Sequence, residues 1–164
     1  MIFETEKLLV RNLVLKDLVP FHELENNPNV LRYADGEVKS YEENKKELYQ
    51  LIEKYSNIDN DFWIYAIERI NDKEFVGTVA LISKDNFVEI GYRFLEKYWG
   101  NGYGYEICDA TITYCKDIGI KKLVGYVVNK NIASAKILEK CNFKVADEFV
   151  NDGNQQETKY ELIL

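Results

Sequence analysis

The 164-residue sequence predicts an α+β fold, in which about four helices flank one mixed β-sheet of about seven strands. Three observations predict this fold. Between residues 62 and 94, aromatic and β-branched runs alternate with two short polar turns, which indicates an antiparallel meander. A strand–helix–strand unit over 87–128 predicts one parallel, right-handed crossover. Two last strands around the turn at 151–154 predict a terminal hairpin. Without repeats or a low-complexity linker, we expect residues 1–164 to form a single domain.

The N-terminal elements follow from local patterns. Residues 6–14 read as a first strand, and apolar side chains at helical spacing predict a helix over 15–26. Ser40 and Glu43 have the spacing of a capping box, so a second helix is expected to begin there and to run to about Tyr55.

The remaining elements are assigned from the same signals. The expected strands of the meander cover 62–70, 74–83 and 87–94. They are followed by a helix over 103–118 with Gly119 as its C-terminal cap, a strand over 121–128, a helix over 132–140, and strands near 143–150 and 156–163.

Composition excludes several classes of function. The net charge of −7 argues against a general nucleic-acid binder, because phosphate contacts need a basic surface. The same charge suits a cationic substrate such as an amine, or serves only to keep the protein soluble. No apolar run approaches the length of a membrane helix, and the acidic N-terminus does not resemble a signal peptide, so we expect a cytoplasmic protein without a membrane partner.

Metal sites and histidine-based triads are not expected. The three cysteines, Cys108, Cys115 and Cys141, lack metal-ligand spacing and are expected to be reduced packing residues. The only histidine is His22, which nearly excludes a Ser-His-Asp triad or a metal site with several histidines. We expect His22 to be structural or exposed.

The most informative segment is the glycine cluster formed by Gly100, Gly102 and Gly104, between an expected strand and an expected helix. Such a junction is typical of an anion site, where free N–H groups and the helix dipole point the same way. A P-loop is excluded, since no Gly-Lys pair occurs. A dinucleotide fingerprint is disfavoured, since its third glycine would fall on Tyr105 or Ile107.

A third type of phosphate site fits both the spacing and a distant segment. Residues 89–106 resemble the acyl-CoA signature of the GNAT N-acetyltransferases, Gln/Arg-x-x-Gly-x-Gly/Ala, with Trp99 at its first position. Residues 131–143 resemble the second signature of that family, Asn-x-x-Ser-x-x-x-Leu-Glu-Lys-x-Gly-Phe. The opening at 6–11, together with Trp99, resembles the branch that acetylates ribosomal-protein N-termini, the RimJ/RimL-like enzymes.

The resemblance implies a sheet splayed at its centre, with acetyl-CoA between the strand ending near Phe94 and the strand of 122–128. Backbone N–H groups of 101–105 would hold the pyrophosphate, and main-chain groups of 93–95 would pair with the pantetheine arm. Asn131 would contact the thioester end; its alternative role, and that of Ser134, is helix capping. The implied cofactor-binding residues are Arg93, Phe94, Leu95, Trp99, Gly100, Asn101, Gly102, Tyr103, Gly104, Tyr105, Asn131 and Ser134.

Two positions depart from the family pattern. Asn142 replaces the glycine of the second signature, and asparagine is the next best residue for a left-handed helix end. Leu138 stands where many members have a tyrosine that protonates the leaving thiolate. Another acid, Ser134 or water, must therefore act here, or the reaction needs little help.

The expected reaction transfers an acetyl group to a primary amine, either a protein N-terminus or a small amine, by direct attack on the thioester. Glu89 is the candidate general base, or else a solvent-facing strand carboxylate. Backbone N–H groups near Phe94 and Leu95 could polarise the carbonyl. The candidate acceptor-binding residues, or else ordinary loop residues, are Arg32, Tyr33, Asp35, Glu37 and Trp63. The alternative function is an idle acyl-CoA-binding or sensing domain, and the chain is expected to be a monomer or a homodimer.

Overall fold

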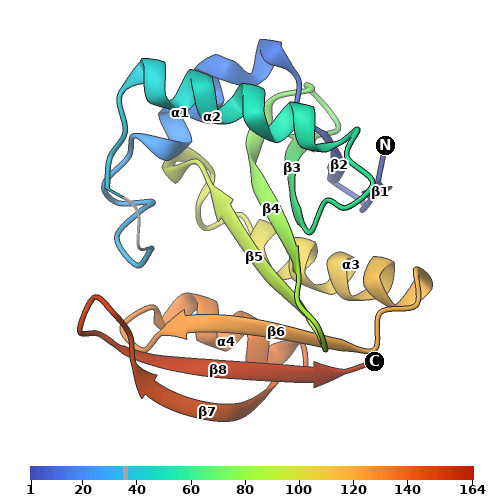
Figure 1. Cartoon of the computed structure of the whole chain (residues 1–164), viewed down its shortest axis with the longest axis vertical. Coiled ribbons are helices and arrows are strands. Elements are labelled where there is room, and N and C mark those ends of the chain that lie inside the picture. Colours follow the sequence, from blue (N-terminus) through green and yellow to red (C-terminus); the bar gives the residue numbers. More distant parts are fainter. Residues whose placement is uncertain (35–36) are drawn as a thin grey trace.

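The chain forms one open β-sheet with helices on both faces (Figure 1), in a computed structural model that describes residues 1–34 and 37–164. Within this part of the chain, the strand order is β1-β2-β3-β4-β5-β6-β8-β7. The strands are β1 (Phe3–Glu4), β2 (Leu8–Asn12), β3 (Phe62–Arg69), β4 (Phe75–Ser83), β5 (Val88–Phe94), β6 (Lys122–Val128), β7 (Lys144–Val150) and β8 (Gln156–Ile163). The helices are α1 (Leu18–Glu25), α2 (Tyr41–Lys54), α3 (Tyr103–Asp117) and α4 (Ile132–Lys140), with short 3-10 turns at Leu15–Asp17 and Glu96–Tyr98.

The mixed α+β fold and the terminal hairpin are confirmed, and the short strand β1 is the one addition to the seven expected. The expected helix over 15–26 is present, with a first turn of 3-10 type at Leu15–Asp17 that runs directly into α1. The Asp17 side chain caps this start. Its Oδ2 accepts the Val14 N–H at 2.9 Å and the Arg11 Nη1 at 2.7 Å.

The sheet opens at its centre, as expected. The strands β5 and β6 are parallel neighbours that pair only through Val88 with Leu123 and Glu89 with Val124. Beyond these pairs the two strands diverge (Figure 1). On its other edge β5 stays paired with β4 along its whole length, from Ser83↔Val88 to Gly77↔Phe94. One side of β5 therefore keeps a row of backbone groups that no neighbouring strand uses.

The alternation of side chains along the strands divides the core into two clusters. On one face, α1 and α2 bury Phe21, Leu24 and Leu48 against Ala66 of β3. On the other face, α3 and α4 bury a larger cluster that includes Tyr65 and Ile67 of β3, Ile107 and Leu138. The three cysteines belong to the second face, where all are buried and free, which confirms their role as packing residues.

Three predicted helix ends are confirmed. The Ser40 Oγ accepts the Glu43 N–H at 3.3 Å, and the Glu43 carboxylate accepts the Ser40 N–H at 2.7 Å, so the capping box is complete. Gly119 ends α3 with φ +86°, and Asn142 ends α4 with φ +68° in the left-handed region. No helix among the described residues has the length and apolar character that crossing a bilayer requires.

Candidate active site

The loop before α3 presents a row of free backbone donors. Gly100 and Gly102 have φ values of +79° and +78°, in the left-handed region that glycine adopts most easily. Gly102 is the N-cap of α3, and the first helical bond runs from the Glu106 N–H to the Gly102 carbonyl at 3.2 Å. No described residue accepts a hydrogen bond from the N–H groups of 100–105. These donors, at the positive end of a helix, form a cradle for an anion.

The start of α4 lies across from this loop. The Asn131 Oδ1 accepts the Ser134 N–H at 3.3 Å, so Asn131 caps α4. Helix capping was one of the two roles expected for this residue. The neighbouring Lys130 has no ion-pair partner in the described part of the chain. Lys130 therefore adds a positive charge at the start of α4, across from the loop of 100–105.

A cavity of about 850 Å³ lies between the loop and α4; we call it the glycine-loop cavity. It brings together the predicted cofactor residues from three separate segments, with Leu95 as the exception. Those that line it are Arg93, Phe94, Trp99, Gly100, Asn101, Gly102, Tyr103, Gly104, Tyr105, Asn131 and Ser134. Lys130 also lines the cavity, although sequence reasoning did not select it.

The backbone of β5 explains why Leu95 is absent. The Leu95 N–H donates to the Val76 carbonyl at 2.9 Å, so it is engaged by β4 and cannot polarise a bound carbonyl, which corrects that expectation. Because backbone groups alternate along a strand, those of Tyr92 and Phe94 point away from β4, toward the opening. The Phe94 carbonyl accepts the Trp99 indole N–H at 2.8 Å, which leaves the Phe94 N–H as the available donor.

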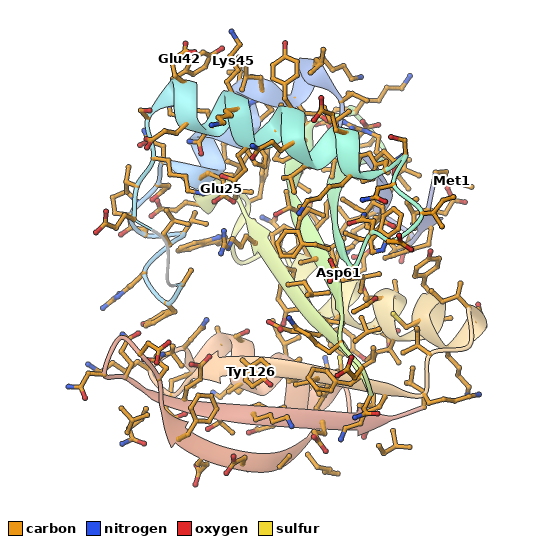
Figure 2. The ribbon with its side chains drawn as sticks, viewed as in Figure 1. Met1, Glu25, Glu42, Lys45, Asp61 and Tyr126 are labelled. Carbon is orange, nitrogen blue, oxygen red and sulfur yellow. The ribbon has the colours of Figure 1, made fainter. Side chains whose placement is uncertain are left out.

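A second cavity of about 450 Å³, which we call the acidic cavity, lies between α1, β5 and β6. Its lining includes the carboxylates Glu25, Glu37, Glu47, Glu89 and Glu157 and the cations Lys39 and Arg93. Glu25 of α1 and Tyr126 of β6 lie on opposite sides of the opening (Figure 2). Arg93 binds both Glu25 oxygens at 3.0 Å, and Lys39 pairs with Glu47 at 2.5 Å. Both cations are thus already neutralised, and the cavity keeps an excess of negative charge.

Glu89 lies on β5 with its side chain in the acidic cavity. Burial raises its pKa above the ordinary value of a glutamate, the charge of Lys84 lowers it, and the nearby charge of Glu157 raises it further. A carboxylate with a raised pKa, open to a cavity, has the properties that a general base needs.

The two cavities share six lining residues, and Tyr92 of β5 lies there with Asn131 and Ser134 of the α4 start. The other three are Val30, Tyr33 and Arg93. Sequence reasoning selected Asn131 and Ser134 but missed Tyr92. The Tyr92 hydroxyl is buried and has no hydrogen-bond partner among the described residues. Burial raises the pKa of Tyr92, while the nearby Ser134 side chain lowers it by a smaller amount. One sequence feature could have identified Tyr92 as a site residue. It lies two residues before Phe94 on β5, so the backbone groups of both residues face the same open side.

The predicted acceptor residues are only partly brought together. Arg32 and Tyr33 line the glycine-loop cavity, Tyr33 and Glu37 line the acidic cavity, and Asp35 lies outside the described residues. The prediction for Trp63 is wrong. Its ring stacks with those of Tyr55 and Tyr65, at centroid distances of 6.2 and 6.1 Å, and belongs to the core on the α3 side.

The alternation of β3 is the reason for this error. The neighbours of Trp63, Phe62 and Ile64, line the acidic cavity from one face of the sheet. The side chain between them must therefore point to the opposite face.

Comparison with known proteins identifies the class of this fold. The profile of the acetyltransferase (GNAT) domain family matches residues 7–144. The chain belongs to this family. It is therefore an acyltransferase by class, and the resemblance seen in the two signatures is confirmed.

A curated relative agrees with this assignment, and solved structures share the fold. The uncharacterized N-acetyltransferase YoaA of Bacillus subtilis is 28% identical over 148 residues, which cover 87% of this chain and 82% of that protein. A spermidine N-acetyltransferase from Vibrio cholerae, solved with CoA and spermine, superposes with a TM-score of 0.80 at 22% identity, over 95% of both chains. The ribosomal-protein-S5-alanine acetyltransferase from Vibrio fischeri gives a TM-score of 0.80 at 22% identity, over 98% and 95% of the two chains.

Proposed function

We propose that this protein is an acetyl-CoA-dependent N-acetyltransferase whose acceptor is a primary amine, and that residues 1–164 act as one domain. The observation that carries the proposal is the row of free N–H groups at 100–105, which opens into the same cavity as the unpaired edge of β5. One end of this cavity fits a pyrophosphate, and the strand edge fits the amide groups of an extended arm. The Vibrio cholerae enzyme of the same fold was solved with CoA, which supports this assignment.

The residues present fit acetyl-CoA at three points. The backbone donors of 100–105 would hold the pyrophosphate, and Lys130 would add a charge near the phosphates. The free backbone groups of Tyr92, on the open edge of β5, would pair with the pantetheine arm. Bound in this way, acetyl-CoA would supply the activated acetyl group.

The acceptor amine would approach through the acidic cavity. An ammonium group is attracted by the excess of carboxylates there, and Glu89 can take its proton so that the neutral nitrogen attacks the thioester carbon. The Phe94 N–H, which stays free on the open edge of β5, would stabilise the negative charge that develops on the carbonyl oxygen. The cavity therefore favours acceptors with a cationic nitrogen, such as a protein N-terminus, a polyamine or an amino-sugar.

The anion cradle can be tested with two variants of nearly equal size. A Cβ atom at Gly102 would have no heavy atom within 4 Å among the described residues, and asparagine and aspartate both tolerate its left-handed backbone. Gly102→Asp places a negative charge beside the pyrophosphate, whereas Gly102→Asn adds the same bulk without charge. By calorimetric titration, we expect acetyl-CoA to bind the Asp variant at least about tenfold more weakly than the Asn variant. Equal affinities in two folded variants would remove the cradle from the proposal.

The acceptor can be tested by measuring thiol release from acetyl-CoA with a panel of amines. The panel should contain peptides with Ser, Ala and Met N-termini, polyamines and amino-sugars. We expect turnover with at least one class, and loss of that turnover in Glu89→Gln. Tight binding of acetyl-CoA without turnover on any amine would instead support the idle acyl-CoA-binding or sensing domain.

A further inference from the structure

Tyr92 is an unusual residue in this structure. Its side chain is only partly exposed and its hydroxyl is buried. The Ser134 side chain lies close by, but no described residue meets the geometry of a hydrogen bond to the Tyr92 hydroxyl. A buried hydroxyl without a partner is destabilising, since its hydrogen bond to water is lost on folding. This orphan hydroxyl points to a ligand group that completes its hydrogen bond.

The surroundings of Tyr92 show where that ligand group must lie. Its side chain lines both cavities, together with Asn131 and Ser134 at the start of α4. The edge of its ring faces Gly104 of α3, where an added Cβ would lie 3.7 Å from the Tyr92 Cε2. The tyrosine thus occupies the narrow space where the splayed strands, the first turn of α3 and the first turn of α4 come together. This is the point where donor and acceptor must meet if the two cavities bind them.

Leu138, which occupies the position of the proton-donating tyrosine in many family members, cannot donate a proton. Leu138 is buried, and its Cδ1 would lie 2.8 Å from a Cβ atom built on Gly125 of β6. The absence of a side chain at Gly125 thus leaves the room that Leu138 fills. An apolar side chain in this space provides no proton, so the proton for the leaving sulfur must come from another element.

We propose that the Tyr92 hydroxyl is the general acid of this enzyme, acting from β5 in place of the missing tyrosine of α4. The inference rests on the proposed acetyl-CoA-dependent function. In the step, the amine nitrogen forms a bond to the thioester carbon, and the carbon–sulfur bond breaks with its electron pair left on sulfur. Tyr92 gives its hydroxyl proton to this sulfur, which yields the free thiol. The nitrogen loses two protons in all. Glu89 passes the first, taken from the ammonium group before attack, to solvent; it then takes the second as the amide forms, and the return of that proton through solvent to the Tyr92 oxygen restores both groups.

Two features of the site suit Tyr92 to this task. The hydroxyl is protonated at neutral pH, since burial holds its pKa above the ordinary value of a phenol, so a proton is present when the sulfur begins to leave. The Ser134 side chain, which is close enough to Tyr92 to lower its pKa, is a positioning residue that can hold the phenol in line and stabilise the phenolate. Ser134 and water were the acids that the sequence left open, and this inference assigns the role to Tyr92 instead.

The test replaces Tyr92 with phenylalanine, which keeps the ring against Gly104 and removes only the hydroxyl. We expect kcat of Tyr92→Phe to fall about 10²-fold, the usual effect of losing a general acid, while KM for acetyl-CoA stays within a few-fold. Thermal stability should be equal or higher, because an unpartnered buried hydroxyl has been removed. Tyr65→Phe is the matched control. Tyr65 is also a buried sheet tyrosine, but it stacks with Tyr55 and lines neither cavity, so its variant should retain wild-type kcat.

A second readout needs no acceptor and no turnover. If the Tyr92 hydroxyl faces the sulfur, it donates a hydrogen bond to the thiolate of bound CoA and lowers the pKa of that thiol. Titration of the CoA complex, followed by the ultraviolet absorbance of the thiolate, should give a thiol pKa higher by about one unit in Tyr92→Phe than in the wild type and in Tyr65→Phe.

The two readouts separate the inference from the function on which it rests. Unchanged kcat and unchanged thiol pKa in Tyr92→Phe would overturn the role of Tyr92 and leave the acetyltransferase intact. If no amine is acetylated by the wild type, the proposed function fails, and the thiol pKa still decides whether Tyr92 faces the sulfur. Failure of CoA to bind the wild-type chain would contradict both.

Discussion

Arg11 belongs to the opening segment that resembles the ribosomal-protein branch, and in the structure its contacts are structural. Its Nη1 and Nη2 bind the two Asp17 oxygens at 2.7 and 2.9 Å, and its Nε binds Glu68 at 2.7 Å. Both carboxylates are buried, and their hydrogen bonds, that of Asp17 first, raise the pKa of Arg11. The guanidinium therefore fixes the turn between β2 and α1, the helix that carries Glu25 into the acidic cavity.

We expect Arg11→Met to destabilise the fold by about 3 kcal/mol, because two buried carboxylates lose their shared partner. Urea unfolding followed by circular dichroism measures this change. The control is Asp72→Asn, which weakens the exposed ion pair between Asp72 and Arg69 and should hardly move the midpoint. A loss in Arg11→Met no larger than in this control would show that the cluster is not a structural anchor.

The raised pKa of Glu89 has two consequences with defined signs. A base must be ionised to act, so kcat/KM should fall as the pH drops through the pKa of Glu89, which lies above that of an ordinary glutamate. A raised pKa also means that the folded state binds this proton more tightly than the unfolded state. The contribution to stability is then greatest at low pH and is lost as the pH rises through the folded-state pKa.

Glu89→Gln should therefore lower turnover strongly and abolish the acidic limb of the pH–rate profile, while stability at neutral pH is unchanged or increased. The profile and a thermal melt of the variant measure both effects. A variant that keeps wild-type turnover and the same acidic limb would exclude Glu89 as the base.

Site residues at helix starts were predicted from the sequence, whereas site residues on strands were not. The glycine cluster and Asn131 were found because local backbone geometry demands these residue types at a helix start. Trp63 was misplaced, and Tyr92 was overlooked, because the facing of a strand side chain depends on which face of the sheet is covered. Which face of the sheet is covered is a property of the tertiary structure, and the sequence of one strand does not reveal it.

At the scale of elements, the β4–β5 pair shapes the site. Gly77 of β4 lies so close to β5 that a Cβ atom would be 2.1 Å from the Arg93 carbonyl oxygen. The close approach holds β5 firmly on β4 while its other edge turns away from β6. Gly91 of β5 is less crowded, and a Cβ there would be 3.9 Å from the Ala80 Cβ.

We expect Gly77→Ala to destabilise the protein by about 3 kcal/mol, the upper part of the range for overpacking, because backbone atoms must move. Gly91→Ala makes the same chemical change on the partner strand and should be tolerated, since its contact is an ordinary van der Waals distance. Thermal unfolding of the two variants provides the comparison. Equal stability of both would show that the tight contact at Gly77 is not required.

The elements themselves were largely predictable because their signals are local. The bounds of α4 are those expected, and Ser40 and Asn142 mark helix ends as their side-chain chemistry requires. The helix over 15–26 is present, but its first turn is of 3-10 type, a detail that the spacing of apolar residues does not predict. The splay of β5 from β6 was expected only through the family resemblance, because strand periodicity contains no signal for it.

At the scale of the molecule, the open sheet is the feature that makes a site. The part with β1–β5, α1 and α2 and the part with β6–β8 are joined at the sheet by two residue pairs, and the opening between them widens away from this point (Figure 1). Both cavities lie along this opening, and their walls come from both parts. A ligand bound there contacts both sides of the molecule at once.

Amide hydrogen exchange with and without acetyl-CoA tests this central claim most directly. Bound ligand should slow exchange at the free donors of 100–105 and at Phe94, and also at the start of α4 near Ser134, on the opposite wall. Amides of the outer strand β7, which lines neither cavity, should change little by comparison. Protection on both walls of the opening is the predicted result. Unchanged exchange at 100–105 under saturating acetyl-CoA would contradict the account.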